Sequence, residues 1–305
     1  MERLGFSYEE VRALNPRIVY GSIKGYADES PYSKYPCFDG VAQAMGVVCS
    51  ITGERDGAPM QSGANLADNI SGVYLSHGIL AALLERERTG RGQLVRINMQ
   101  EVLIQTCRGA FVSQLDDGVE NVRFGNKKFV NRCPHNMYPC KPRGTDGLND
   151  YVFMYVSPVP GSPQWARFCT LIQRPDWIDD PIYSDPMKRA EHRDKIDSEI
   201  TKWTRRYDKE EVMALFAEAG IPCGAVLSTK DIAEGAIYRK AGTIVEVDHP
   251  VLGVHETLGS AFHLSDSPVE VLPSPTLGQH TEETCRNLLH MTPAQIAALQ
   301  EEGVI

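Results

Sequence analysis

The chain has 305 residues, of which 42% are hydrophobic and 23% are charged, and its net charge is −9 at pH 7. This composition supports a sizeable core and up to two domains. The acidic excess argues against nonspecific binding to nucleic acid or to an anionic membrane, and no apolar run is long enough to span a membrane.

The eight cysteines and eight histidines are scattered, with no CxxC pair and no HExxH motif. Dispersed thiols in a chain of this length are typical of a reduced, cytoplasmic protein, so we expect that location and no metal site. The sequence also contains neither a P-loop nor an isolated GxGxxG, which leaves a phosphate site of either kind without support.

The N-terminal residues alternate between helix and strand patterns. Ser7 and Glu10 have the spacing of a capping box, which predicts a short helix that stops at Asn15-Pro16. Residues 18–23 form an apolar run typical of a buried strand, and residues 25–39 have the prolines and tyrosines of a loop.

A long helix is predicted to follow at Asp68 and to end at Gly90. Asp68 is expected to be its N-cap or first-turn acid, because the free N–H groups and the dipole of a helix start favour a carboxylate. The same surroundings hold a carboxylate ionised, and the small residues Gly63, Ala64 and Ala67 leave space for a ligand. Both a capping role and a nucleophilic role fit these residues.

Residues 93–99 read as a strand, and a helix is expected from about Glu101 to Leu115. Together with the preceding segments, this alternation predicts the α/β class with a largely parallel, doubly wound sheet.

The middle of the chain changes character. Residues 118–150 are rich in loop signals, and residues 149–157 read as a strand. Helices are expected from Ser162-Pro163 and over 208–219, followed by a strand over 223–227. These elements predict a smaller α+β domain.

The C-terminal residues combine short strands with a helical tail. Strands are expected over 243–247 and near Leu258. Helices are expected after Thr281 and after Thr292-Pro293, where Gln295 completes a capping box.

Residues 63–101, GANLADNISGVYLSHGILAALLERERTGRGQLVRINMQE, resemble the signature region of the class III CoA-transferases, the formyl-CoA transferase and carnitine CoA-transferase family. The family pattern is an Asp, a nearby Gly, a helix end of the form AL..R..TG.GQ and a strand that ends near MQ. In this chain the pattern corresponds to Asp68, Gly72, Ala82-Leu83, Arg86, Thr89-Gly90, Gly92-Gln93 and Met99-Gln100. Similarity to the family extends over nearly the whole chain.

The resemblance implies an α/β fold with a doubly wound, Rossmann-like large domain, incomplete at its N-terminus, and a smaller α+β domain. Residues 1–124 would belong to the large CoA-binding domain, 125–230 to the small domain, and 231–305 to a segment that returns to the large domain. Family members begin with a segment that precedes the residues matched here, so we expect this chain alone to bind CoA poorly. The family also implies an interlocked homodimer.

The resemblance makes Asp68 the nucleophile of a CoA transfer between an acyl-CoA thioester and a carboxylic acid, through an aspartyl anhydride and an aspartyl-CoA thioester. It implies no permanently bound cofactor, because coenzyme A enters as the thioester substrate. The family's cofactor contacts fall on Arg3, Leu4, Phe38, Asp39 and Met99.

Four of these contacts have a structural alternative. Arg3 and Leu4 would be an ordinary surface arginine and core leucine, Asp39 a loop cap, and Met99 a buried strand residue. Arg132 and His135 are candidates to bind the acceptor carboxylate, and their alternative is a solvated loop.

Two features separate this chain from related enzymes. Residues 129–135 lack the glycine run that the formyl-CoA transferase type places over its active site, so the resemblance does not carry oxalate and formate specificity. Related α-methylacyl-CoA racemases have a histidine where this chain has Phe38, and an apolar ring cannot shuttle a proton. A racemase-like isomerase and an inactive, truncated relative that acts as a subunit are the alternative functions.

Overall fold

The computed structural model describes residues 1–127, 132–143, 147–159 and 161–305. Two compact units share the chain: the first holds residues 1–146 and 150–225, and the second holds residues 147–149 and 226–305. Both contain helices and strands, as the α/β class requires. The domain ranges 1–124, 125–230 and 231–305 stay a prediction.

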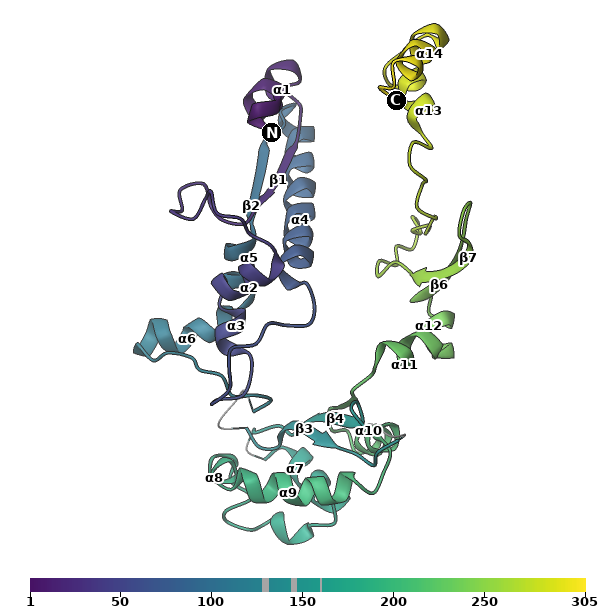
Figure 1. Cartoon of the computed structure of the whole chain (residues 1–305). Helices are drawn as coiled ribbons and strands as arrows, with labels where there is room; N and C mark the ends of the chain where they lie inside the picture. Colours follow the sequence, from purple (N-terminus) through teal and green to yellow (C-terminus); the bar gives the residue numbers. More distant parts are fainter. Residues whose placement is uncertain (128–131, 144–146, 160) are drawn as a thin grey trace. The chain divides into compact units, whose positions relative to one another are not determined.

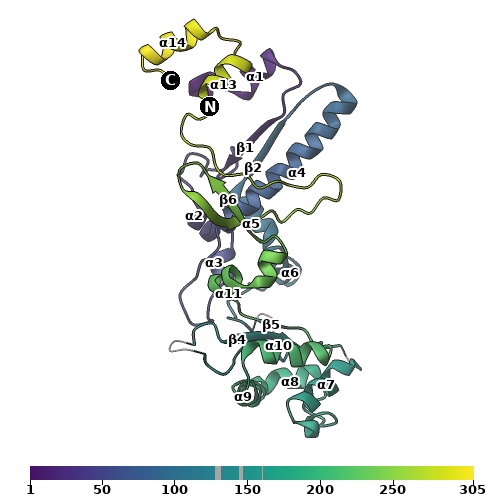
Figure 2. The same ribbon diagram turned by 90° about the vertical axis from the view of Figure 1, so that its right-hand side faces the viewer.

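The first unit contains a β–α–β arrangement that carries Asp68. Strand β1 (Tyr20–Lys24) pairs in parallel with β2 (Leu94–Asn98), and helix α4 (Leu66–Thr89) is the crossover between them. In both views α4 runs beside the two strands (Figure 1, Figure 2). The strands confirm the predicted pair with bounds shifted by one or two residues, and α4 ends at Gly90 as predicted, with φ 72° there. The parallel sheet has these two strands in the described part of the chain, so the doubly wound, Rossmann-like form stays a prediction.

Helix α4 approaches β2 closely because Gly78 has no side chain. A Cβ atom at Gly78 would lie 2.5 Å from Val95 Cγ1, well inside van der Waals contact. Gly72, six residues earlier on α4, has no atom within 4 Å of the corresponding position. One glycine therefore packs the helix on the sheet, and the other leaves open space one turn after Asp68.

Short helices surround this arrangement. They are η1 (Glu2–Leu4), α1 (Tyr8–Leu14), α2 (Asp39–Met45), α3 (Val48–Ile51), α5 (Met99–Thr106) and α6 (Arg108–Asp117). The predicted capping box of α1 is confirmed, since Ser7 N donates to Glu10 Oε2 at 2.9 Å and Glu10 N donates to Ser7 Oγ at 3.2 Å.

The prediction of a single helix over 101–115 is wrong, because the helix is interrupted at Cys107, between α5 and α6. Thr106 Oγ1 donates to the carbonyl of Val102 at 2.8 Å, a side-chain bond that bends helices. Gly109 follows and weakens the helix further.

A small apolar cluster holds the start of α4. It consists of buried residues from α2, α3, α4 and α5, namely Ala42, Val48, Ala67, Met99 and Leu103. Their packing fixes the first turn of α4 between α2 and α5.

The rest of the first unit is an α+β arrangement. Strands β3 (His135–Pro139), β4 (Tyr151–Tyr155) and β5 (Cys223–Ala225) form an antiparallel sheet in that order. The helices beside it are α7 (Pro163–Leu171), η2 (Pro175–Trp177), α8 (Pro186–Glu191), α9 (Arg193–Thr204) and α10 (Lys209–Glu218). The predicted caps Ser162 of α7 and Asp208 of α10 are confirmed.

Strand β3 lies in a segment that the sequence predicts to be loop. Its residues HNMYP lack hydrophobic alternation, so pairing with β4 and long-range bonds to Asp197 stabilise it instead. Asn136 Nδ2 and Tyr138 Oη donate to the Asp197 carboxylate at 3.1 and 2.6 Å. A large core supports this sheet and includes Phe168, Trp177 and Phe216.

The second unit contains α11 (Thr229–Glu234), α12 (Ala236–Lys240), the antiparallel pair β6 (Ile244–His249) and β7 (Gly253–Leu258), α13 (Thr281–Asn287) and α14 (Pro293–Glu301). The two predicted strands and the two tail helices are confirmed. Its buried apolar side chains include Val247, Cys285 and Ile296, whereas Phe262, Leu272 and Leu277 are exposed.

No helix in the described ranges combines the length and apolar character needed to cross a membrane. All eight cysteines are free thiols.

Candidate active site

Asp68 is the third residue of α4 and its side chain is exposed. The first-turn position predicted for it is confirmed, but the N-cap is Asn65, whose side chain makes no capping hydrogen bond. The carboxylate therefore stands at a helix start, where the dipole favours a negative charge, and is accessible to a ligand.

Asp39 caps α4 from a different helix. It is the first residue of α2, and its Oδ1 accepts hydrogen bonds from the N–H groups of Ala67 at 2.7 Å and Asp68 at 3.3 Å. These two donors belong to the four that a helix start leaves without partners in the helix. Asp39 thus caps a helix and not a loop, as its alternative had it, while its role as a CoA contact stays a prediction.

Gln43 connects Asp39 to the segment that leads into α4. Its side chain is fully buried, and its Nε2 donates to Asp39 Oδ2 at 2.7 Å and to the carbonyl of Ala64 at 3.2 Å. Its Oε1 accepts from Ser62 N at 2.8 Å. Sequence reasoning missed Gln43, because its partners Ser62 and Ala64 lie 19 and 21 residues along the chain.

Cys37 lies close enough to Asp68 for the charge of Asp68 to act on its thiol. Burial raises the pKa of the Cys37 thiol, a hydrogen bond with Tyr26 lowers it, and the negative charge of Asp68 raises it again. The thiol is therefore kept protonated beside the candidate nucleophile.

Met99 and Phe38 lie on the helices next to Asp68. Met99 is buried in the cluster that contains Ala67, and it begins α5 rather than ending the strand as predicted. Phe38 is the N-cap of α2 and its ring is 80% exposed. The starts of α2, α4 and α5 thus bring together four predicted site residues: Phe38, Asp39, Asp68 and Met99.

Arg3 and Leu4 belong to η1 and both are exposed, so the alternative of a core leucine is wrong. Arg3 lines an open cavity of about 270 Å³ together with Lys24 and Arg96. The latter two both pair with Asp28, at 2.5 and 2.6 Å. Glu2 and Glu9 line the same cavity, so it presents side chains of both charges.

Arg132 and His135 lie beside the antiparallel sheet. His135 begins β3, and its ring meets Phe153 edge-on with centroids 5.0 Å apart. Burial lowers the pKa of His135, which keeps the ring neutral over a wider pH range. The solvated-loop alternative is therefore wrong for His135. Arg132 lies with its guanidinium 5.9 Å from the ring centre of Tyr155, and its carbonyl accepts from Arg193 Nη2 at 2.6 Å.

The loop predicted to match the family's glycine-rich loop covers Phe129–Val130–Asn131–Arg132–Cys133–Pro134–His135. Residues 129–131 of this stretch lie outside the described residues. Cys133 is buried in the large core, and burial raises the pKa of its thiol to about 12. That thiol is consequently an inert core group.

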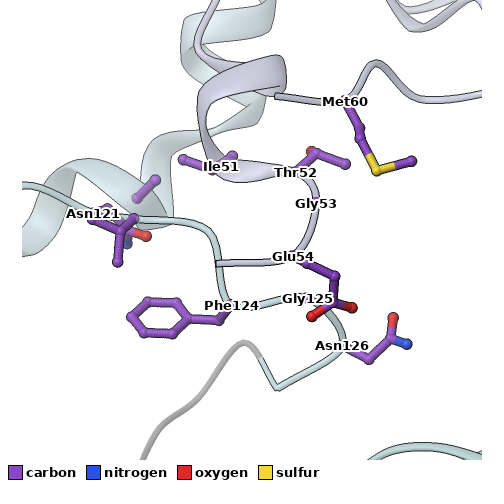
Figure 3. A pocket seen from close by; sticks show the side chains of 11 residues that line it. Ile51, Thr52, Gly53, Glu54, Met60, Asn121, Phe124, Gly125 and Asn126 are labelled. Carbon is purple, nitrogen blue, oxygen red and sulfur yellow. The ribbon is translucent and has the colours of Figure 1, made fainter. Parts of the chain in front are cut away.

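A second cavity, of about 470 Å³, contains none of the predicted site residues (Figure 3). It lies between the end of α3 with its following loop and residues 121–126, and its lining includes Ile51, Met60, Phe124, Glu54 and Asn126. Figure 3 shows the Glu54 carboxylate beside Gly125. Its volume is in the range of small-molecule sites, and its mostly apolar lining suits an apolar group.

The described residues contain no group of three or more His, Cys, Asp or Glu side chains placed to hold a metal ion. The described site offers an accessible carboxylate, Asp68, at a helix start that Asp39 caps.

Comparison with known proteins places the chain among CoA-transferases. Residues 1–281 match the model of the family described as CoA-transferase family III. The formyl-CoA:oxalate CoA-transferase of Bradyrhizobium sp. (strain ORS 278) is 37% identical over 100% of this chain and 74% of its own length. The enzyme of the same name from Streptomyces coelicolor is 39% identical, over 100% of this chain and 75% of its own length.

Solved structures share the fold. A CaiB/BaiF family protein from Brucella suis superposes with a TM-score of 0.78 and 23% identity, over 94% of this chain and 72% of its own. Rv3272 from M. tuberculosis gives a TM-score of 0.76 at 22% identity, over 92% of this chain and 73% of its own.

Proposed function

The chain belongs to CoA-transferase family III, and on this premise we propose that Asp68 is the nucleophile that moves coenzyme A from an acyl-CoA thioester to a carboxylic acid. The observation that carries the proposal is the place of Asp68: an exposed carboxylate on the first turn of a helix whose N–H groups another carboxylate already caps. A carboxylate of this kind can attack a thioester carbonyl directly and form a covalent intermediate.

The proposed reaction has four steps. The Asp68 carboxylate attacks the thioester carbonyl, the C–S bond breaks, and an acyl-aspartyl anhydride and CoA thiolate result. The thiolate attacks the aspartyl carbonyl, which gives an aspartyl-CoA thioester and releases the donor acid. The acceptor carboxylate then attacks this thioester, forming a second anhydride and freeing the thiolate again. Attack of the thiolate on the acceptor carbonyl gives the new acyl-CoA and restores Asp68.

The environment of Asp68 supports these steps. The unoccupied space next to Gly72, one turn along α4, leaves room for the acyl group and the thiol beside the carboxylate. Because Asp39 accepts the Ala67 and Asp68 N–H bonds, the helix start stays ordered when Asp68 loses its charge in the anhydride.

We assign coenzyme A contacts to Arg3, Leu4, Phe38, Asp39 and Met99. Arg3 is the proposed phosphate contact, on a cavity that it lines with Lys24, Arg96, Glu2 and Glu9, and the exposed ring of Phe38 offers an apolar surface for the pantetheine arm. Met99 backs the first turn of α4 through Ala67. Arg132 and His135 are proposed to meet the acceptor carboxylate. No permanently bound cofactor is part of the proposal.

The donor and acceptor are proposed by class only: an acyl-CoA and a carboxylate. The curated relatives named formyl-CoA:oxalate CoA-transferase make that pair the first to test. We further propose that the chain works in the cytoplasm as an interlocked homodimer, supported by its eight free thiols and by the exposed apolar side chains of the second unit.

A trapping experiment tests the nucleophile. The protein is incubated with an acyl-CoA panel that includes formyl-CoA, quenched with hydroxylamine, and digested for peptide mass spectrometry. We expect a hydroxamate on Asp68, and CoA transfer to oxalate or another carboxylate that Asp68→Asn abolishes. Asp194→Asn is the matched control, since Asp194 is also an exposed acid in the first turn of a helix, α9.

The outcome also separates the alternatives. Transfer that persists in Asp68→Asn would contradict the mechanism. Exchange of an α-proton with solvent, without transfer, would point to the racemase-like isomerase. A wild-type chain that shows neither reaction and gains transfer only with a second polypeptide would be the truncated subunit.

A further inference from the structure

We propose that Gln43 is the positioning residue of the Asp68 nucleophile, a role that rests on the proposed function. Its amide joins the two structures that bear on Asp68: the Asp39 carboxylate that caps α4 and the 62–64 segment that leads into α4. Gln43 touches no reacting atom and acts only through these neighbours.

The hydrogen bonding of Gln43 is nearly complete. Both protons of Nε2 have acceptors, Asp39 Oδ2 at 2.7 Å and the Ala64 carbonyl at 3.2 Å, and Oε1 accepts from Ser62 N at 2.8 Å. The side chain is 0% exposed, so water cannot replace these bonds. A buried amide with each of these partners in place holds a single orientation and transmits it to all of them.

The bonds form a continuous path to the nucleophile. Gln43 holds Asp39 Oδ2, which leaves Oδ1 directed at the N–H groups of Ala67 and Asp68. Gln43 also holds Ser62 and Ala64, only a few residues before Asp68. The backbone of the nucleophile is therefore fixed from both sides by one amide.

Position matters more here than stability. Displacement of a reacting group by about 1 Å can cost about a hundredfold in rate. The bond from Asp68 N to Asp39 is the longest of this path, at 3.3 Å, so it is the one that a small shift of Asp39 breaks first.

Two variants separate the amide's roles. Gln43→Met keeps the length of the side chain and removes every one of its hydrogen bonds. Gln43→Glu keeps the acceptor for Ser62 N but places a second acid next to the Asp39 carboxylate. The other titratable groups close by are Asp68, whose N–H donates to Asp39, and the Cys37 thiol, which senses the charge of Asp68. The control is Gln164→Met, because Gln164 likewise accepts from a backbone N–H (Ser157, 2.9 Å) and donates to a carbonyl (Gly220, 3.4 Å) without contact to Asp39.

The first readout does not depend on activity. Amide hydrogen exchange of the peptide that contains residues 62–68 is followed by mass spectrometry in the full chain. We expect Gln43→Met to speed exchange of the Ala67 and Asp68 amides by about tenfold, the equivalent of one lost hydrogen bond, and Gln164→Met to leave them unchanged.

The second readout is kinetic. In Gln43→Met we expect kcat for CoA transfer to fall by about 10- to 100-fold with KM changed by less than about threefold, because Gln43 itself contacts no ligand and Arg3, Leu4, Phe38 and Met99 are unchanged. In Gln43→Glu we expect activity to fall as pH rises. The acid group next to the Asp39 carboxylate has a raised pKa; below that pKa it is neutral and can donate to Asp39, and above it the two charges repel. The wild-type amide does not titrate, so its profile lacks this limb.

These readouts overturn the proposal in distinct ways. Exchange and kcat in Gln43→Met equal to those of Gln164→Met would show that Gln43 does not position the nucleophile. If Gln43→Met does not fold by circular dichroism, a flat activity ratio of Gln43→Glu to wild type across pH would equally contradict it. If wild type transfers no CoA while Gln43→Met still loses protection at 67 and 68, the proposed function fails and the positioning of this turn stands.

Discussion

Asp39 and Asp68 meet at the same helix start, and the hydrogen bonds of the first turn go to Asp39. Asp68 is left exposed, with its carboxylate available for chemistry. Capping by a residue from α2 thus separates two tasks, ordering of the helix and reaction, that one side chain could not perform together, because an acylated carboxylate is a poor cap.

The cap can be tested through stability. Asp39→Ala should lower the free energy of unfolding by about 1 kcal/mol, because it leaves two N–H groups of α4 without an acceptor. Asn65→Ala should cost close to zero, since the N-cap residue Asn65 makes no side-chain capping bond. Urea unfolding followed by circular dichroism measures both. A larger loss for Asn65→Ala than for Asp39→Ala would show that the cap is assigned to the wrong residue.

Removal of the Asp68 charge should change the reactivity of the Cys37 thiol. The Asp68 charge raises the pKa of that thiol, so Asp68→Asn should lower the pKa, increase the thiolate fraction at pH 8 and speed alkylation by iodoacetamide. Cys49 is the internal control, because burial alone raises the pKa of its thiol. Peptide mass spectrometry resolves the two sites, and an unchanged Cys37 rate in the variant would contradict their proximity.

Whether a residue of this site could be predicted depends on how far along the sequence its contacts lie. Asp68 was predictable, because a helix start and the family pattern are both local in sequence. Gln43 was not, because its partners Ser62 and Ala64 lie 19 and 21 residues away and nothing in the intervening residues specifies the pairing. Asp39 was singled out, but its connection to Ala67, 28 residues on, appears only in the folded chain.

At the scale of elements, features that depend on residues close in sequence were predicted, and features that depend on distant partners were not. The N-caps Ser7, Ser162, Asp208 and Thr292 begin helices as expected, since each cap satisfies its own backbone within three residues. Strand β3 was missed because its partner strand and Asp197, rather than its own pattern, stabilise it. The break at Cys107 was missed because a side-chain bond of Thr106 competes with the helix.

Substitution of the two α4 glycines, Gly72 and Gly78, by alanine should change the stability of the protein in opposite directions. Gly72→Ala should raise the free energy of unfolding by about 0.5 to 1 kcal/mol through helix propensity, yet reduce CoA transfer, because it fills open space next to Asp68. Gly78→Ala should lower stability by about 1 to 3 kcal/mol, because its Cβ would meet Val95 Cγ1 at 2.5 Å. Thermal unfolding and transfer rates measure both.

A partner substitution checks the cause. Val95→Ala in the Gly78→Ala background should recover part of the lost stability, whereas it should not help Gly72→Ala. A Gly78→Ala protein as stable as wild type would mean that α4 does not pack closely on β2.

At the scale of the whole molecule, the two units differ in how much apolar surface they bury. The first has a core of aromatic and aliphatic residues around Phe168, whereas the second exposes many of its large apolar side chains and has no regular element between β7 and α13. Exposed apolar surface of this extent is typical of an interface.

Limited proteolysis should reveal this difference. Chymotrypsin is expected to cut first between residues 259 and 280, at exposed sites such as Phe262, Leu264 and Leu277, because the backbone there lacks regular hydrogen bonding. Intact mass spectrometry of early fragments identifies the cut. First cleavage within residues 161–225 would contradict the expectation, and protection of 259–280 at high protein concentration would indicate that self-association covers it.

The cap that Asp39 provides for α4 also bears on the order of folding. The first turn of α4 cannot satisfy its own N–H groups through Asn65, so it becomes stable only after α2 has docked against it. In a partly folded chain in which α2 and α4 are still apart, the Asp68 carboxylate therefore has no fixed position. Acyl-CoA would meet an assembled nucleophile only in molecules that have completed this tertiary step, which couples the onset of reactivity to the end of folding rather than to the formation of the helix itself.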